Sequence, residues 1–180
     1  PSIVLDDTTA AYEIVNYLIS KGHKKIGVIG GYDNNMHTHL RLDGYKKALK
    51  EAGIKMNRDY VKFAGWELKD AYSVSEELVS KGVTAVFCMC DRLAGGLYKY
   101  LAEKGIKPGK DISVAGFDNQ DIAEYFVPGL TTTALPLRDI GTKAAEKLIK
   151  IIKGSEVQKD NEVEYVPLKF IERDSVCKVD

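Results

Sequence analysis

The sequence predicts an α/β fold with a doubly wound parallel sheet, arranged as three α/β/α layers. An apolar-periodic helix, a glycine and a short apolar strand follow one another four times along the chain. The glycines, Gly22, Gly53, Gly82 and Gly105, stand 31, 29 and 23 residues apart (22 to 53, 53 to 82, 82 to 105), which suits αβ units. The strands are continuous apolar runs, as expected for a parallel sheet that helices cover on both faces.

Each helix is predicted from apolar side chains that recur three or four positions apart, and each glycine stands where a helix commonly ends in a left-handed residue. The helical stripes are Ala11-Ile14-Val15-Leu18-Ile19, Leu42-Tyr45-Ala48-Leu49-Ala52, Ala71-Val74-Leu78-Val79 and Leu93-Ala94-Leu97-Tyr98-Leu101, and the strands that follow them are 26–29, 60–63, 85–89 and 112–115.

The repeating pattern ends after residue 118. Residues 118–126 suggest a short helix that Pro128-Gly129 ends, and 130–135 suggest a Thr-rich strand. One isolated amphipathic helix is predicted over 137–153, a polar loop follows, and 164–173 supply one or two final strands. We therefore expect one α/β domain to end near residue 127, the chain to leave it, and a strand to return.

Composition excludes several classes of protein. The chain has 180 residues, 44% of them hydrophobic, with 26 Lys and Arg against 26 Asp and Glu. Such a chain can bury a core and is not disordered. No apolar run approaches the roughly 20 residues that a membrane span needs, and no signal-peptide pattern is present. Because phosphate-backbone binding relies on clustered basic residues, these 180 residues are not expected to grip nucleic acid by themselves.

The cysteines indicate a reducing compartment, and hence the cytoplasm. Cys88, Cys90 and Cys177 are odd in number and lack the spacing of a disulfide framework. Cys88 and Cys90 lie in an apolar run, so buried free thiols are the preferred interpretation of this pair. The loop imidazoles His37 and His39 could suggest a metal, but no third ligand accompanies them. We therefore predict neither a metal nor a cofactor.

Polar and aromatic side chains follow each strand of the predicted sheet. In open parallel sheets, ligands bind beyond the carboxyl ends of the strands. Carboxylates accept hydrogen bonds from hydroxyl pairs, a guanidinium donates a fork, and an indole covers an apolar ring face. These groups together suit a polyhydroxylated ligand. The candidate binding residues are Arg41, Trp66, Asp91 and Asp118, with Asn35 and His37 nearby.

Simpler interpretations stand beside these. Asp91 equally suits the N-cap of the helix that follows it. Arg41 could be a solvated helix charge, and Trp66 could be a packing residue. Gly30-Gly31 is no dinucleotide fingerprint, and no phosphate loop or nucleophile elbow occurs. The sequence therefore holds no good catalytic constellation, and an enzyme is not expected.

Five stretches carry a family resemblance: LISKGHKKIGVIGG (18–31), RLDGYKKALKEAGI (41–54), CDRLAGGLYKYLAEKGIKPGKDISVAGFDN (90–119), PGLTTTALPLRDIGTKAAEKLI (128–149) and LKFIERDS (168–175). In this order they make the chain resemble the LacI/GalR family of bacterial transcriptional regulators along almost its whole length. The resemblance implies a fold like a type I periplasmic sugar-binding protein, with two α/β subdomains linked by three crossovers and a small effector in the cleft.

The resemblance also implies a division of the chain. Residues 1–129 would be the C-terminal subdomain, 130–160 a strand and helix of an otherwise absent N-terminal subdomain, and 161–180 strands that return to the C-terminal subdomain. A helix-turn-helix headpiece, a hinge and most of the first subdomain would precede Pro1. The apolar face of helix 137–153 would then need another partner, or the helix would be mobile.

Site residues carry over position by position. Arg41 in RLDGY matches the family's effector-binding arginine, Trp66 matches an aromatic residue that covers the ligand, and Asp118 in GFDN matches an effector-binding aspartate. Asp91 departs from the family, because sugar responders usually have asparagine there. This departure leaves the hydroxyl pattern of the ligand open.

Further positions concern the cleft and a partner subunit. Asn35 and His37 fall in a loop that lines the cleft in the family. Tyr125 and Phe126 lie where family members dimerise, so they are candidate dimer contacts. The implied partners are a small carbohydrate or similar polar metabolite, a second copy of the chain, and operator DNA through the absent headpiece. No membrane partner is implied.

Three functional hypotheses follow. The first is the effector-sensing part of a LacI/GalR-type regulator. The second is a periplasmic-type sugar-binding protein of a transporter, against which stand the free cysteines and the regulator-like stretches PGLTTTALPL and IERDS. The third is a small α/β enzyme that uses the cleft aspartates, and no motif supports it.

Overall fold

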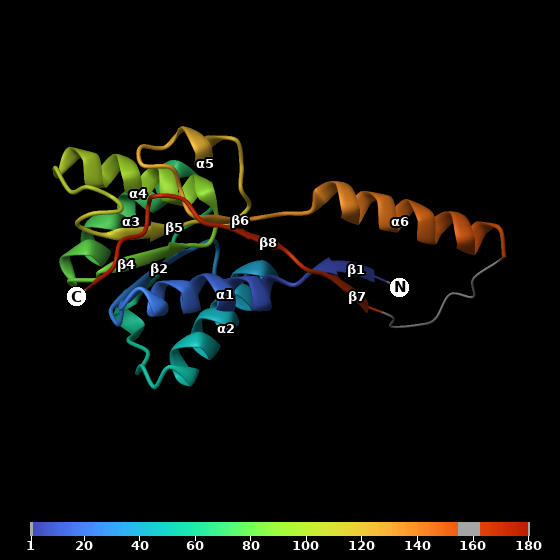
Figure 1. The fold of residues 1–180 in the computed structure, drawn as a ribbon, viewed down its shortest axis with the longest axis horizontal. Helices are drawn as coiled ribbons and strands as arrows, with labels where there is room; N and C mark the ends of the chain where they lie inside the picture. The colour runs from blue at the N-terminus through green and yellow to red at the C-terminus, as the bar shows by residue number, and fades with distance from the viewer. Residues whose placement is uncertain (1, 155–162, 180) are drawn as a thin grey trace.

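The molecule divides into a layered body and an arm that projects from it (Figure 1). A computed structural model describes residues 2–154 and 163–179. The arm holds β1 (Ser2–Leu5), α6 (Leu137–Ile152) and β7 (Val163–Val166). The body holds α1 (Asp7–Ser20), β2 (Ile26–Gly30), α2 (Met36–Glu51), the 3-10 helix η1 (Arg58–Tyr60), β3 (Val61–Phe63), α3 (Leu68–Ser80), β4 (Ala85–Cys88), α4 (Asp91–Glu103), β5 (Ser113–Ala115), α5 (Ile122–Tyr125), β6 (Thr132–Ala134) and β8 (Lys169–Ile171).

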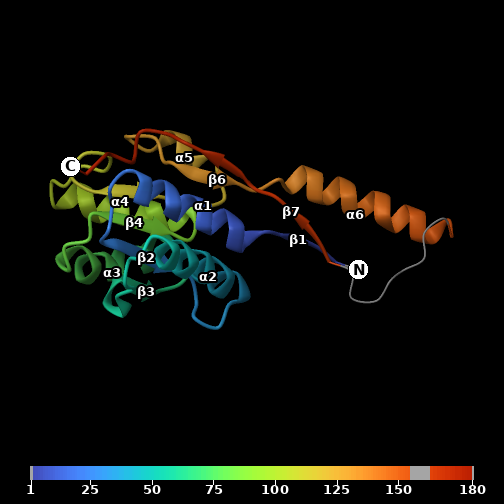
Figure 2. The same ribbon diagram turned by 60° about the horizontal axis from the view of Figure 1, so that its bottom comes forward.

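A parallel four-stranded sheet in the order β3-β2-β4-β5 forms the middle layer of the body. The chain moves from β2 to the edge strand β3 and then back across the sheet to β4 and β5, so right-handed crossovers put α2 on one face and both α3 and α4 on the other. Accordingly α1 and α2 pack together on one face, and α3 and α4 pack together on the other (Figures 1 and 2). The predicted doubly wound, three-layer fold is confirmed.

Both faces of the sheet are buried, as the continuous apolar strands predicted. Every residue of β2, β4 and β5 is buried. Tyr45 of α2 is 1% exposed, and its hydroxyl donates to the carbonyl of Ile26 over 2.9 Å. Cys88 and Cys90 are buried free thiols, as predicted, and Cys177 is a half-buried one.

The four predicted helix ends are confirmed, because Gly22, Gly53, Gly82 and Gly105 all have positive φ between 68° and 95°. The short helix predicted over 118–126 covers only Ile122–Tyr125. Its expected first turn is replaced by two left-handed residues, Asp118 (φ 100°) and Asn119 (φ 51°), which cannot continue a right-handed helix.

Residues 130–134 lie in the body, whereas the sequence assigned them with the following helix to a second subdomain. Leu130 and Thr132 are fully buried, and Thr131 and Ala134 form parallel bridges to Ala115 and Asp118 beside β5. Strand β6 then pairs antiparallel with β8. Hydrogen bonding to both neighbours holds this Thr-rich strand at the sheet edge, so the chain leaves the body at Leu135 and not at residue 130.

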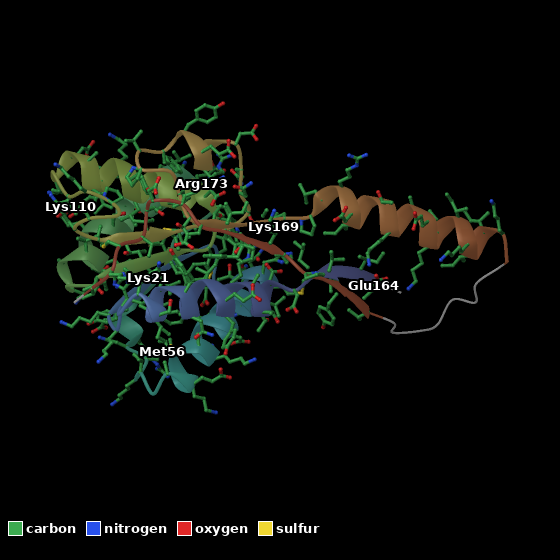
Figure 3. All side chains as sticks on the ribbon, viewed as in Figure 1. Lys21, Met56, Lys110, Glu164, Lys169 and Arg173 are labelled. Atoms are coloured by element: carbon green, nitrogen blue, oxygen red, sulfur yellow. The ribbon has the colours of Figure 1, made fainter. Side chains whose placement is uncertain are left out.

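The arm consists of three segments that are distant in sequence. Strand β1 pairs in parallel with β7, and α6 packs lightly beside β1. Lys143 of α6 forms an ion pair with Glu164 of β7. Of the predicted return strands, β7 therefore belongs to the arm and only β8 runs along the body. Figure 3 shows Glu164 on the arm and Lys169 where the arm joins the body.

Helix α6 has no fully buried residue. Ile140 is half-buried towards β1, while Leu148 and Ile152 are 58% and 74% exposed. The apolar stripe that predicted this helix is thus largely uncovered in the single chain, and its covering by a second chain stays a prediction. The predicted polar loop at 155–162 lies outside the described residues.

Candidate functional site

Five charged or polar side chains meet at the carboxyl edge of the strands. Arg41 lies in α2, which follows β2, and Asp118 follows β5. His37 lies one turn before Arg41 on the same helix, and Asp91 begins α4 directly after β4. The fifth is Asp7, the first residue of α1 beyond β1. The parallel topology brings these carboxyl ends to one place.

Arg41 is a buried, fixed guanidinium rather than a solvated helix charge. Its side chain is 6% exposed. Nε donates to Asp7 Oδ1 over 2.7 Å, and Nη1 donates to the carbonyl of Met89 and lies 3.5 Å from Asp118 Oδ1. Its Cζ stands 3.8 Å from the centroid of the Phe117 ring. These contacts approach from separate elements and hold the guanidinium in one orientation.

Asp118 faces Arg41 from the β5 end of the site. Its side chain is 15% exposed. Burial raises the pKa of this carboxyl to about 6, against the charge of Arg41 and the hydrogen bond from Gln120, which lower it. The backbone of Asp118 is held by hydrogen bonds with Thr133 and Leu135. The carboxylate is therefore positioned to accept hydrogen bonds from a ligand.

Arg173 of the C-terminal segment fixes the loop that carries Asp118. Nη1 donates to the carbonyl of Leu130 over 2.7 Å, and Nη2 donates to Asn119 Oδ1 over 2.8 Å and to Glu124 Oε1 over 3.2 Å. Arg173 lies in the IERDS stretch that contributed to the family resemblance. The sequence did not predict its hydrogen bonds to this loop.

Trp66 lies over the loop after β2. A Cβ added at Gly31 would meet the indole ring within 2.1 Å, so only glycine leaves room for the ring there. Arg41 Cζ stands 6.0 Å from the Trp66 ring. The half-buried indole is therefore both a packing residue and a neighbour of the guanidinium.

Asn35 is the N-cap of α2, whereas His37 lies in the first turn of that helix and not in a loop as predicted. The side chain of Asn35 caps α2 by accepting from the backbone N–H groups of His37 and Thr38. His37 Nδ1 lies 2.8 Å from Asp7 Oδ2, and because a carboxylate only accepts, Nδ1 carries the proton. The imidazole is half exposed, which leaves its other nitrogen accessible.

Asp91 is fully buried, and its carboxylate supports the loop after β5. Oδ2 accepts from the N–H of Gln120 over 2.7 Å, and Oδ1 accepts from the hydroxyl of Thr132 over 2.6 Å. The N-cap of α4 is Cys90, so Asp91 is not the cap. Burial raises the pKa of Asp91 to about 7, although both hydrogen bonds lower it. Contact of this carboxylate with a ligand stays a prediction.

The buried Asp91 makes a testable contribution to stability. Its pKa rises from 3.8 to about 7 on folding, so the folded state binds the proton more tightly, and this contribution is lost as pH rises from about 4 to 7. Asp91→Asn keeps both contacts, since Oδ1 can accept from Gln120 and the amide can donate to Thr132. We expect the variant to be more stable than wild type at pH 8 by on the order of 2 kcal/mol, and the gain to vanish near pH 4.

Urea unfolding of both proteins from pH 4 to pH 8 measures this difference. Asp43→Asn controls for removal of a charge, because that carboxylate is 59% exposed on α2. A gain at Asp91→Asn that is the same at every pH would contradict the expected titration.

Asp7 was not among the residues that the sequence singled out. It is 1% exposed and contacts both Arg41 and His37, so it belongs to the same cluster. Asp7 follows closely after the strand β1. The other candidates were chosen because they follow strands, so the same criterion could have identified Asp7. The sequence analysis assigned residues 2–5 to the same subdomain as the sheet, so the residue after this strand was not considered as part of the site.

The two candidate dimer contacts differ in exposure. Tyr125 is 81% exposed, and its neighbour Val127 is 89% exposed. The Phe126 ring instead stacks on Tyr98 within the chain, with ring centroids 4.7 Å apart. Tyr125 is free to contact a partner, whereas Phe126 also packs α5 onto α4. The dimer assignment of both residues stays a prediction.

A largely apolar cavity of about 530 Å³ lies next to the cluster. Asp7 and His37 line it on the body side, and Leu5, Ile140 and Tyr165 line it from the arm. Of the predicted site residues only His37 lines this cavity. Within residues 2–154 and 163–179, no group of three or more His, Cys, Asp or Glu side chains is arranged to hold a metal ion. None of the helices described is long and apolar enough to span a membrane.

The fold and this cluster define a ligand-binding α/β domain whose site lies at the carboxyl edge of a parallel sheet. The profile of the periplasmic binding protein-like domain matches residues 15–176. The chain belongs to this family, in the form that LacI-family transcriptional regulators carry. The resemblance inferred from the sequence motifs is confirmed.

Individual relatives support the same assignment. The HTH-type transcriptional repressor PurR of Vibrio vulnificus (strain CMCP6) is 35% identical over 179 residues, which are 98% of this chain and 53% of that protein. The repressor CytR of Escherichia coli (strain K12) is 35% identical over 159 residues, covering 87% and 47%. A LacI family regulator from Enterococcus faecium with bound ribose is 30% identical, with a TM-score of 0.90 over 99% of this chain and 66% of that one.

The chain spans about half the length of the curated relatives it matches. These relatives are named as transcriptional repressors, which favours the regulator hypothesis over a transporter's sugar-binding protein. The same relatives agree with the expectation that the chain is not an enzyme.

Proposed function

We propose that this chain is the larger part of the effector-sensing domain of a LacI/GalR-type regulator and binds a small carbohydrate between body and arm. The observation that carries the proposal is the buried pair of Arg41 and Asp118, 3.5 Å apart, at the carboxyl edge of the sheet. A fixed donor beside a fixed acceptor recognises a hydroxyl group in both of its hydrogen-bonding roles.

The surroundings of the pair suit a sugar ring. Trp66 offers an apolar face 6.0 Å from the guanidinium, and His37 offers its exposed imidazole edge. The solved relative from Enterococcus faecium holds ribose, which supports a carbohydrate as the chemical class. The division into a C-terminal subdomain over 1–129 and part of an N-terminal subdomain over 130–160 is proposed with its boundary moved to Leu135, after β6.

Signalling would follow from linkage between ligand and conformation. An effector that binds the closed arrangement of the two subdomains more tightly shifts the population towards it. We propose that this shift changes operator binding by a helix-turn-helix headpiece outside the chain. The protein would act in the cytoplasm as a homodimer, with the exposed Tyr125 and the packed Phe126 at or near the contact.

Calorimetry of the intact protein with a panel of sugars tests the proposal. Arg41→Ala and Asp118→Ala should each weaken binding of the best sugar at least about tenfold, because each removes a charge-assisted hydrogen bond. Arg58→Ala is the matched control, since Arg58 is exposed in η1 away from this edge. If both site variants bind the sugar as wild type does, the site assignment is wrong.

A further inference from the structure

Asp7 is buried at the start of α1, although it is not the N-cap of that helix. The neighbouring Asp6 caps α1 by accepting from the N–H of Thr9 over 3.1 Å, so the cap does not require Asp7. Yet the side chain of Asp7 is 1% exposed, and a buried carboxylate is costly unless it is paired. Its two oxygens are used separately, one by Arg41 Nε and the other by His37 Nδ1.

This arrangement fixes which part of the guanidinium faces a ligand. Asp7 occupies Nε, and the carbonyl of Met89 occupies Nη1, which also faces Asp118. Among the described residues, none accepts a hydrogen bond from Nη2. The Phe117 ring covers one face of the guanidinium. Without Asp7, the side chain would lose the hydrogen bond that holds Nε and with it the plane of the guanidinium in place.

The same contact removes the positive charge that an anionic ligand would need. Arg41 lies between the carboxylates of Asp7 and Asp118, at 2.7 Å and 3.5 Å. Asp91 is buried nearby, where the charge of Asp118 raises the pKa of its carboxyl. A phosphate group would therefore meet more carboxylates than permanent cations, and like charges a few ångströms apart in a buried site repel strongly.

We propose that Asp7 is a positioning and specificity-determining residue, which orients Arg41 and cancels its charge so that the site selects an uncharged polyhydroxylated effector over its phosphate ester. This inference rests on the proposed function and names the ligand class of that site. Hydroxyl pairs satisfy the carboxylate acceptors, whereas a phosphate group adds only acceptors and negative charge.

The test compares neutral sugars with their phosphate esters on the intact wild-type protein. D-ribose and D-ribose 5-phosphate, and D-glucose and D-glucose 6-phosphate, are titrated by calorimetry at low and moderate salt. We expect the better neutral sugar to bind at least about tenfold more tightly than its phosphate ester. Tighter binding of the ester would overturn the inference while leaving the proposed function intact. Binding of none of the four would overturn both.

Variants separate charge from positioning. Asp7→Asn can still accept from Arg41 Nε but leaves the guanidinium charge uncancelled, so it should reduce the preference for the neutral sugar at least about tenfold. Asp7→Ala should weaken both ligands, because it removes the orienting contact. Asp6→Asn, which alters the adjacent cap, should leave the preference unchanged. An unchanged preference in Asp7→Asn would refute the charge-cancelling role, and it is a readout that a merely structural residue would not move.

Discussion

Replacing Phe117 by alanine should lower the free energy of unfolding by about 3–5 kcal/mol, the usual cost of removing a buried phenyl ring. Phe117 lies two residues beyond β5 and is 0% exposed, and its ring centroid lies 6.5 Å from that of Phe87. The ring also supports Arg41, whose Cζ stands 3.8 Å from its centroid. Sugar binding should therefore weaken at temperatures where the variant is still folded.

Urea unfolding and calorimetry of the same preparation measure the two effects. Phe117→Leu fills most of the space and should cost less than about 1.5 kcal/mol, so any further loss of sugar affinity in it reports the missing ring. Phe63→Ala, at a 37% exposed position on β3, controls for loss of a phenyl group. Stability of Phe117→Ala within 1 kcal/mol of wild type would contradict the buried position.

Gly44→Ala should cost about 3 kcal/mol, at the upper end of what overpacking causes. An added Cβ would lie 2.3 Å from the carbonyl oxygen of Thr8 and 2.8 Å from the backbone nitrogen of Tyr12. Both atoms are backbone, so α1 and α2 must separate to make room. Separation would also draw Asp7 of α1 away from Arg41 of α2, so sugar binding should fall with stability.

Gly141→Ala is the matched control for this substitution. It lies within α6 with no atom inside 4 Å of an added Cβ. There alanine should stabilise the helix by about 0.5–1 kcal/mol through its better propensity. Thermal unfolding of the two variants side by side decides the matter, and equal melting temperatures would show that α1 and α2 are not packed as described.

Much of the fold was predictable because local patterns carry it. Periodic apolar stripes ending at Gly22, Gly53, Gly82 and Gly105 define four αβ units without tertiary information. Because ligands bind beyond the carboxyl ends of parallel strands, the sequence also placed Arg41 and Asp118 in one cluster. In the structure, Arg41 Nη1 lies 3.5 Å from Asp118 Oδ1.

What the sequence could not predict depends on contacts between distant segments. Asp7 meets Arg41 only because β1 delivers it to the edge, 34 positions away in the chain. Strand β6 belongs to the body because it pairs with Asp118 after β5 and with β8, which its Thr-rich composition does not encode. Asp91 looked like a cap or a ligand contact, and its inward partners, Gln120 and Thr132, are 29 and 41 positions away.

The arm has a mechanical consequence. Body and arm are joined by three short tethers, at residues 5–7, 135–137 and 166–169, and Asp6 and Val166 of two of them are hydrogen-bonded to each other over 3.2 Å. A single connection would let the arm rotate about any axis relative to the body. Three connections side by side restrict twisting of the arm, so we expect bending of the arm relative to the body to be the easiest motion. Because Asp7 ends the first of these connections, we expect bending of the arm to displace the carboxylate that pairs with Arg41.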